Sequence, residues 1–272
     1  MRLSGKVAVV TGASMGIGEA IARIFLEEGA SVVFSSRDAA RVEAARGRAG
    51  SSERSLAVTC DVRNREEIDR LLGLTLHNFG RCDIWVNNAG HGLMDTVEKL
   101  DLQQVRQLLE TNLIGAIGGM QVAVPVMKQQ GSGAIINVSS VAGYITVPGS
   151  GAYGATKSAL NAIGRAAAME LKGTGVHVMT VCPGYIDTNF LANSVRGNDP
   201  RRLGASARRG SNVRGVAVAT LEGYLKQKQV VVVPWKYQVL IWVYQLFPSL
   251  LENYMAKNLR PADEVMREAI GR

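Results

Sequence analysis

Tyr153 and Lys157 are the residues of this chain whose types and spacing most directly suggest chemistry. They stand four positions apart, so a helix would bring both side chains onto one face. A free phenol titrates near pH ~10, and a neighbouring positive charge lowers its pKa. A tyrosine in that setting could protonate a carbonyl oxygen, or take a proton from an alcohol, close to neutral pH. The pair therefore indicates acid–base chemistry on a carbonyl or hydroxyl group.

A glycine-rich turn near the start of the chain predicts the second reactant, a dinucleotide. Gly12, Gly16 and Gly18 directly follow the apolar run Val7–Val10. In a strand–turn–helix unit, such glycines permit a tight turn, a close approach of the backbone to a pyrophosphate, and close packing of the helix on the strand. The helix that follows would direct its unpaired amides and the positive end of its dipole at the phosphates. The predicted cofactor contacts in this turn are Gly12, Ser14, Met15, Gly16, Ile17 and Gly18.

The rest of the chain alternates strand-like and helix-like segments that could position these side chains. Apolar runs of strand length occur at Val7–Val10, Ser31–Ser35, Ser55–Cys60, Ile84–Asn87, Gly133–Val138, Val176–Cys182 and Val230–Val233. The amphipathic stretches between them include Glu19–Glu28, Arg63–Phe79, Leu102–Lys128 and Tyr153–Leu171, which are long enough for right-handed crossovers. The alternation predicts an α/β fold, a single-domain Rossmann-like doubly wound fold with a seven-stranded, mostly parallel sheet flanked by helices on both faces.

Composition favours a packed enzyme over several other classes. A length of 272 residues and an apolar content of 47% suit one large α/β domain. The formal net charge is +8, but the basic residues are scattered except for one late cluster, which argues against nucleic acid as a partner. The first apolar stretch is too short for a signal peptide, so we expect a cytoplasmic chain. The cysteines and histidines lack the spacing of metal ligands, so no metal is expected.

The end of the second predicted strand indicates which dinucleotide is bound. A ribose 2′-hydroxyl suits a carboxylate, whereas a 2′-phosphate needs a cation. Ser36 stands where an NAD-binding chain would usually carry an acidic residue, and Arg37 follows it. We therefore expect NADP(H) to be preferred over NAD(H), with an ordinary surface role for Arg37 as the alternative. Asp38 lies one residue further and could cap the next helix.

Taken together, these motifs resemble those of the short-chain dehydrogenase/reductase family. The resemblance covers about residues 4 to 235 and rests on Thr11–Gly18, Cys60–Val62, Asn87–Gly90, Asn112, Ser139–Ser140, Tyr153–Lys157 and Pro183–Gly184. It implies that Asp61 and Val62 hold the adenine. It also implies that the cofactor packs on Asn88, Ala89 and Gly90, and that the nicotinamide faces Pro183, Gly184, Ile186 and Thr188.

The resemblance also implies the catalytic roles. Tyr153 would be the acid/base, and Lys157 would lower its pKa and hold the ribose hydroxyls of the nicotinamide half. Ser140 would hydrogen-bond the substrate oxygen where negative charge develops. We choose Ser140 over Ser139 because its distance in sequence from Tyr153 is typical of the family. Asn112 would hold a water that links Lys157 to solvent, with a polar contact between helices as the alternative.

The segment 235–272 follows the predicted catalytic domain, 1–234, as an apolar and aromatic helical extension. No charged residue lies between Lys236 and Glu252. This stretch is too short to span a bilayer, which takes about 20 residues, and Pro248 would kink it. Three interpretations remain open: a helix in a membrane interface over 235–255, a subunit contact, or a lid over an apolar substrate pocket. The extension is similar to those of membrane-associated family members that reduce lipid or steroid ketones.

These features predict an NADP(H)-dependent carbonyl reductase for an apolar, lipid-like or steroid-like ketone or alcohol. One alternative is an NAD-dependent alcohol dehydrogenase for a small soluble substrate. Another is a dinucleotide-binding sensor without turnover, although a sensor has no need to keep Asn112, Ser140, Tyr153 and Lys157 together. The resemblance further implies a homodimer or homotetramer formed through the helices Leu102–Lys128 and Tyr153–Leu171.

Overall fold

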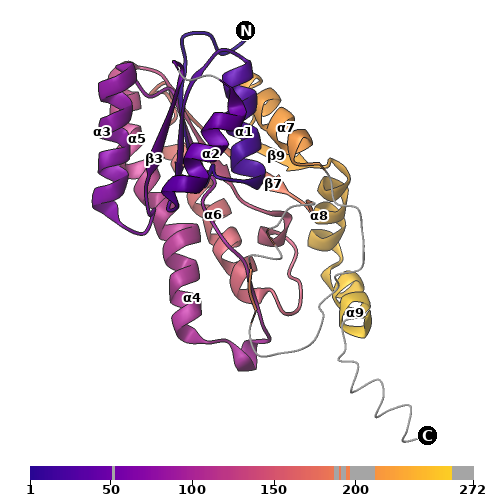
Figure 1. Cartoon of the computed structure of the whole chain (residues 1–272). Coiled ribbons are helices and arrows are strands. Elements are labelled where there is room, and N and C mark those ends of the chain that lie inside the picture. Colours follow the sequence, from indigo (N-terminus) through magenta and orange to yellow (C-terminus); the bar gives the residue numbers. More distant parts are fainter. Residues whose placement is uncertain (51–52, 187–189, 191–193, 197–211, 259–272) are drawn as a thin grey trace, which may run out of the picture.

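One parallel sheet forms the centre of the molecule (Figure 1). The computed structural model describes residues 1–50, 53–186, 190, 194–196 and 212–258. The sheet has the strand order β3-β2-β1-β4-β6-β7-β9, and every pairing in it is parallel. Its strands are β1 (Val7–Thr11), β2 (Ser31–Ser36), β3 (Ser55–Thr59), β4 (Ile84–Asn87), β6 (Gly133–Val138), β7 (Val176–Pro183) and β9 (Val230–Val233). The doubly wound fold and all seven expected strands are confirmed.

Helices cover both faces of the sheet, which explains why its strands are continuous apolar runs in the sequence. One face packs against α1 (Gly16–Glu27), α2 (Ala39–Ala49) and α7 (Val213–Leu225). The other face packs against α3 (Arg65–Phe79), α5 (Gly115–Gln130) and α6 (Gly151–Glu170). In Figure 1, α1 and α2 lie in front of the sheet and α7 lies to their right. Each face of the sheet thus has its own hydrophobic core, and the sheet lies between the two. Strands packed on both sides hold the loops at their carboxyl ends in fixed positions.

The helix expected over Leu102–Lys128 is interrupted, which corrects the sequence-based prediction. It consists of α4 (Leu102–Leu109), a π-helical turn, η2 (Glu110–Ile114), and α5. A π turn inserts one extra residue into a helix and is often found at functional sites. Asn112 lies within it. The sequence-based prediction has one regular helix over the whole stretch and does not include this turn.

Four short elements and two helices complete the part of the chain that the structure describes. Two-residue strands β5 (Leu93–Met94) and β8 (Val195–Arg196) pair in parallel, and 3-10 turns occur at η1 (Val97–Lys99) and η3 (Val141–Gly143). The apolar extension forms α8 (Lys236–Leu246) and α9 (Pro248–Asn258), so the helix breaks at Pro248 as expected. Within these described ranges, no helix has both the length and the apolar character needed to cross a membrane.

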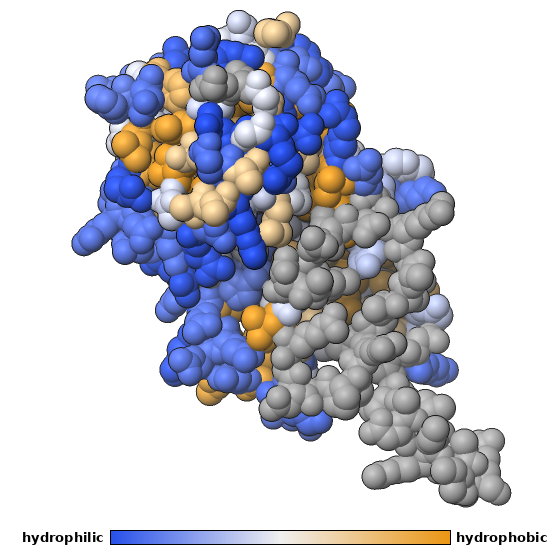
Figure 2. Space-filling view, in the orientation of Figure 1, coloured by the Kyte–Doolittle hydropathy of each residue, from blue (hydrophilic) through white to orange (hydrophobic). Residues whose placement is uncertain are grey.

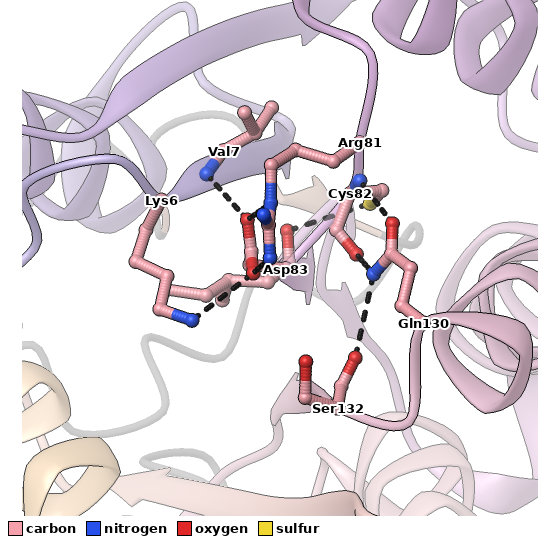
Figure 3. Close-up of polar contacts among 8 residues, drawn as sticks. Lys6, Val7, Arg81, Cys82, Asp83, Gln130 and Ser132 are labelled. Carbon is pink, nitrogen blue, oxygen red and sulfur yellow. Dashed lines mark hydrogen bonds and ion pairs between the residues drawn. The ribbon is translucent and has the colours of Figure 1, made fainter.

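Asp83 joins the first strands at the end of the sheet where β1 and β4 begin (Figure 3). Its buried carboxylate accepts hydrogen bonds from the Val7 amide at 3.0 Å, from Lys6 Nζ at 3.2 Å and from Arg81 Nε at 2.7 Å. Burial alone would raise the pKa of this carboxyl, but the bonds from Arg81, Val7 and Lys6 outweigh burial and lower it. The carboxylate is thus a structural anchor at the sheet end opposite the predicted cofactor turn.

Candidate active site

A cleft of about 820 Å³ opens at the carboxyl ends of the central strands. In a doubly wound sheet, this is where ligands bind, next to the point at which the strand order reverses. Side chains and backbone from most of the predicted motifs line it, including Gly12, Met15, Gly16, Ile17, Asn88, Gly90, Ser140, Tyr153, Lys157, Pro183, Gly184 and Ile186. The fold therefore brings together residues that are up to about 170 positions apart in the sequence.

The glycine turn has the geometry that a close-approaching ligand requires. Gly12 and Gly16 have φ angles of 64° and 61°, in the left-handed region that favours glycine. A Cβ on Gly12 would lie 2.8 Å from Ala89 Cα, and one on Gly18 would collide with the Gly12 carbonyl. The expected reasons for these glycines, a tight turn and close helix packing, are therefore visible. The first residues of α1, Gly16 and Ile17, line the cleft, and the amino-terminal end of a helix suits the diphosphate of a dinucleotide.

Thr11 and Asn88 lock this turn to the end of β4. Thr11 Oγ1 accepts from the amides of Asn88 at 3.0 Å and Ala89 at 3.1 Å. The Asn88 side chain donates to the carbonyls of Thr11 at 2.9 Å and Gly12 at 3.1 Å. Asn88 thus supports the turn as well as lining the cleft, and Ala89 supports the turn through its amide. Gly90 is exposed at the cleft, and a Cβ there would lie 3.7 Å from Lys157 Nζ.

The predicted adenosine end contains several charged side chains. Asp38 caps α2, because its side chain accepts from the Arg41 amide at 2.9 Å. Arg37 is exposed, and the Ser36 hydroxyl donates to the Asp38 carbonyl. The Asp61 carboxylate accepts from Arg63 Nη2 at 2.6 Å, and this hydrogen bond lowers the pKa of Asp61. The Asp61 carboxylate is therefore already bonded to Arg63. An adenine amino group that donates to this carboxylate would do so beside the Arg63 guanidinium.

Val62, the second residue predicted to contact the adenine, is buried against the start of α5. A Cβ on Gly115 would lie 2.8 Å from Val62 Cγ2, so the two backbones approach closely. Val62 thus helps to fix the loop after β3 against α5. This packing is sufficient to explain the position of Val62, whether or not the side chain also contacts a ligand.

Tyr153 and Lys157 lie on one face of α6, as their spacing predicts. Lys157 Nζ is 5.9 Å from the centroid of the Tyr153 ring and donates to the Val138 carbonyl at 2.9 Å. Burial lowers the pKa of Lys157 to about 8 and raises the pKa of Tyr153 to about 12. The hydrogen bond between Ser140 and the Tyr153 phenol acts in the opposite direction but does not overcome burial. The expected lowering of the phenol pKa is therefore reversed in the protein by itself, because desolvation dominates.

The two adjacent serines have different roles. The Ser139 hydroxyl is buried and donates to the Lys157 carbonyl at 3.2 Å, which joins the end of β6 to α6. Ser140 Oγ accepts from the Ala142 amide at 3.1 Å and donates to the Pro183 carbonyl at 3.5 Å. Of the two serines, Ser140 is the one whose side chain acts to lower the pKa of the Tyr153 phenol. The choice of Ser140 over Ser139 as the residue that contacts the substrate stays a prediction.

The Asn112 side chain connects two parts of the site. Its Oδ1 accepts from the His91 amide and its Nδ2 donates to the His91 carbonyl, both at 3.0 Å. Nδ2 also lies 3.2 Å from Thr156 Oγ1 on α6. Asn112 therefore makes the polar contact between helices that was the alternative, through Thr156. It makes two further hydrogen bonds to the backbone of His91. The predicted water at Asn112 stays a prediction.

The predicted nicotinamide side is built by β7 and by a residue from the extension. The Gly184 amide donates to the Val233 carbonyl at 2.7 Å, and a Cβ on Gly184 would collide with the Tyr237 ring. Tyr237 Oη accepts from the Tyr185 amide at 3.4 Å. Pro183 and Ile186 line the cleft, while Thr188 lies outside the described residues.

Several cleft residues were not assigned to the site from the sequence. His91 lines the cleft, and burial, followed by the charges of Arg37, Arg63 and Lys157, lowers its pKa. Phe190 packs on Tyr153 with the ring centroids 5.5 Å apart. The apolar extension contributes Tyr237, Leu240, Leu251, Tyr254 and Met255. The uncharged stretch indicated a possible lid, but nothing in the sequence indicated Phe190, because its contact depends on long-range packing.

The three cysteines, which could in principle act as nucleophiles or metal ligands, are buried in the core. Burial raises the pKa of the Cys60 thiol to about 11 and that of Cys82 and Cys182 to about 12. Such thiols are poor nucleophiles and poor metal ligands. In the part of the chain that the structure describes, no three His, Cys, Asp or Glu side chains come together in a way that could hold a metal ion.

Comparisons with known proteins agree with this geometry. Residues 6–199 match the model of the short chain dehydrogenase family. An uncharacterized oxidoreductase of Staphylococcus aureus is 37% identical over 190 residues, which is 70% of this chain and 82% of the relative. A relative from Staphylococcus epidermidis, also described as an uncharacterized oxidoreductase, is 37% identical over 187 residues, 69% of this chain and 80% of that protein.

Solved structures show the same likeness. A short chain dehydrogenase/reductase from Burkholderia phymatum, solved with NAD, is 26% identical, with a TM-score of 0.82 over 92% of this chain and 96% of that one. A 3-ketoacyl-(acyl-carrier-protein) reductase from Brucella melitensis, solved with NADH, is 28% identical, with a TM-score of 0.76 over 85% of this chain and 97% of that one. The chain is therefore an oxidoreductase that belongs to the short chain dehydrogenase family.

Proposed function

We propose that this chain reduces the carbonyl group of an apolar ketone or aldehyde, with NADP(H) as the cofactor. One observation carries the proposal: the glycine turn, Ser140, Tyr153 and Lys157 open into a single cleft whose remaining walls are largely apolar. Family membership supports a nicotinamide dinucleotide in this cleft, and the turn has no room for side chains at Gly12 or Gly18. The bound dinucleotide would supply the hydride, and the protein supplies the proton.

Tyr153 is suited to be the acid in this reaction. Because its pKa is raised to about 12, the phenol carries its proton at neutral pH. It gives that proton to the carbonyl oxygen as the carbonyl carbon receives the hydride, and the product is an alcohol. The Ser140 hydroxyl, whose presence beside the phenol acts to lower its pKa, can donate to the same oxygen while negative charge develops on it.

Lys157 supports the proton transfer. With a pKa of about 8, its ammonium form predominates at pH 7. A positive charge 5.9 Å from the ring centroid stabilises the phenolate that remains after transfer. The same ammonium would hold the ribose hydroxyls of the nicotinamide half. Asn112, which bonds the backbone at His91, would hold the water through which the proton returns.

The preference for NADP(H) is argued from the end of β2. Asp38 is engaged in capping α2 through the Arg41 amide, and its carboxylate also lies 3.3 Å from Arg41 Nε. It is therefore a poor partner for a ribose 2′-hydroxyl. Arg37 is exposed beside Ser36, and a guanidinium suits a 2′-phosphate. NAD(H) is the second candidate, because the Burkholderia and Brucella structures contain NAD and NADH.

The apolar substrate is argued from the walls of the cleft. Val141 directly follows Ser140, and together with Ile145 it forms one apolar cluster with α8 and α9. Leu240, Leu251 and Met255 complete the wall on that side. A polar substrate would lose its water there without gaining hydrogen bonds, whereas an apolar one gains roughly 25 cal/mol for each Å² removed from water. The apolar wall therefore favours a hydrocarbon body next to the reacting carbonyl.

The proposal is tested by following the oxidation of NADPH and of NADH with a panel of ketones, from short polar ones to long-chain and polycyclic ones. Tyr153→Phe is the control, since it keeps the ring but removes the proton. We expect turnover that favours NADPH and long apolar ketones and that is lost in the variant. A lower KM for NADH would contradict the cofactor assignment, and turnover of short polar ketones alone would contradict the substrate class. Tight dinucleotide binding without any turnover would instead indicate a sensor.

A further inference from the structure

The helix α8 is apolar on two opposite faces. Ile241 points inward and is only 2% exposed, in a cluster with Val141 and Ile145. On the opposite side, apolar residues recur at helical spacing and are 37 to 72% exposed: Trp235, Val239, Trp242, Val243 and Leu246. A helix that is apolar all round is normally covered on all sides. We call these five residues, together with Phe247 and Leu250, the outer face.

The outer face continues to the mouth of the cleft. Phe247 and Leu250, next to and within α9, are 62% and 68% exposed. Tyr254, one turn further along α9, is itself 62% exposed and also lines the cleft. The same two helices therefore present apolar side chains both to the outside and to the predicted substrate site. In Figure 1, α8 and α9 lie at one side of the molecule, with α9 extending away from the sheet.

The composition of the outer face favours a bilayer over a second copy of the chain as its cover. Subunit contacts typically carry about one hydrogen bond for every 100–200 Å² that they bury. The side chains of the outer face offer only the indole nitrogens of Trp235 and Trp242 as polar atoms. A bilayer needs no such partners, because each apolar side chain that enters it contributes independently.

The charges nearby suit a lipid surface. In α8, Lys236 at its first turn is the one charged residue, and α9 carries Glu252 and Lys257. Glu252 is engaged with the Tyr244 hydroxyl at 2.9 Å. The chain as a whole has a formal net charge of +8, which favours approach to anionic headgroups. Figure 2 shows hydrophilic residues over much of the upper and left parts of the molecule, with an apolar patch among them at the upper left.

We propose that the outer face docks on a lipid bilayer that contains anionic lipids, and that the cleft takes its carbonyl substrate from that bilayer. The docking stands on the exposed side chains alone, whereas the delivery of substrate rests on the proposed function. Trp235 and Trp242 enter the headgroup region, where tryptophan is favoured. An apolar ketone then passes from the bilayer along Tyr254 into the cleft without crossing water.

Tryptophan fluorescence tests the docking directly. The chain has three tryptophans, of which Trp85 is fully buried and the other two lie on the outer face. Vesicles of phosphatidylcholine and phosphatidylglycerol with brominated acyl chains are expected to quench Trp235 and Trp242. In the double variant Trp235→Phe/Trp242→Phe, the remaining emission of Trp85 is expected to stay unquenched. Unchanged emission of the natural chain at saturating vesicle concentration would overturn the proposal.

A second measurement uses vesicle sedimentation to compare a double variant of the outer face with a single control variant at another exposed leucine. Leu246→Gln/Phe247→Gln is expected to weaken vesicle partitioning by at least about tenfold, since two apolar side chains no longer enter the bilayer. The control is Leu102→Gln at the start of α4, where the leucine is 68% exposed against 72% for Leu246. Equal partitioning of both variants and the natural chain would overturn the proposal. So would a smaller particle for the outer-face variant in light scattering with unchanged partitioning, because a second copy would then be the cover.

Turnover separates this inference from the proposed function. NADPH oxidation with a water-soluble ketone and no vesicles is expected to be the same for the natural chain and for Leu246→Gln/Phe247→Gln. With a long-chain ketone supplied in vesicles, the variant is expected to be at least about tenfold slower. Equal rates in that second assay would overturn delivery from the bilayer. Vesicle binding without turnover of any ketone would support the docking and refute the proposed function.

Discussion

Replacing Lys157 by methionine is expected to stabilise the fold at neutral pH while abolishing NADPH oxidation. The ordinary pKa of a lysine, 10.5, falls to about 8 at this position because the ammonium is buried. At about 1.36 kcal/mol per pH unit, this difference means that the buried charge destabilises the folded protein by about 3 kcal/mol at low pH. Methionine has a similar length and carries no charge, so the variant avoids this cost.

The sign of the pH dependence follows from which state binds the proton. Below pH 8 the folded and unfolded chains both hold it, and the folded chain bears the full cost of burial. Between pH 8 and 10.5 the unfolded chain alone binds the proton, so the stability of the natural protein rises with pH. The advantage of Lys157→Met should therefore shrink by about 2.5 kcal/mol between pH ~7 and ~10.

Urea unfolding of both proteins at the two pH values measures this change. Loss of the hydrogen bond to the Val138 carbonyl affects the variant equally at both, so it does not enter the difference. Lys172→Met is the matched control, because Lys172 is exposed and its ammonium stays hydrated when the chain folds. The reasoning is refuted if the free-energy difference between Lys157→Met and the natural chain is the same at both pH values.

Four further outcomes are expected. Ser140→Ala should lower kcat by about 10²-fold or more, through loss of a donor to the substrate oxygen. Ser139→Ala should instead lower the free energy of unfolding by about 1 kcal/mol and leave kcat within a few-fold of the natural value. Similar kcat values for the two variants would contradict these different roles. Arg37→Ala should raise the KM for NADPH by about tenfold or more and that for NADH little, and parallel changes would place Arg37 outside the cofactor site. Leu240→Gln should raise the KM for apolar ketones about tenfold with the cofactor KM unchanged, which steady-state kinetics can check. We expect light scattering to find a dimer or tetramer that Ile163→Glu on α6 dissociates, and 29.1 kDa particles of the natural chain would count against it.

The sheet could be predicted from the sequence because its strands are buried on both sides. Runs such as Val7–Val10 have no polar residue to confuse their assignment, and the parallel order follows from the helices between them. The proximity of the predicted catalytic pair could also be read from the sequence, since Tyr153 and Lys157 lie on one helix and need no tertiary contact to be paired. The features that could be predicted are thus those that depend on residues close together in the sequence.

Features that depend on distant contacts were missed. The π turn around Asn112 lies in a stretch that the sequence-based prediction has as one regular helix, and the structure reveals it. Phe190 reaches Tyr153 from another part of the chain. The direction of the Tyr153 pKa was wrong because spacing shows a nearby ammonium but not the loss of water around the phenol. For the extension, the sequence showed an apolar helix but could not show which of its faces the protein covers.

The packing of Tyr237 against Gly184 has a consequence for the order in which the protein is made. The glycine turn, Asn112, Ser140, Tyr153 and Lys157 all leave the ribosome before α8 does. Until Tyr237 arrives, the backbone at Gly184 and Tyr185 lacks its neighbour, and Val141 and Ile145 lack the helix that covers them. The strands can pair in the nascent chain, since folding during synthesis proceeds from the first-made part. The cleft therefore acquires its last wall after the strands β1 to β7 have been made and together with β9, which ends close to the start of α8.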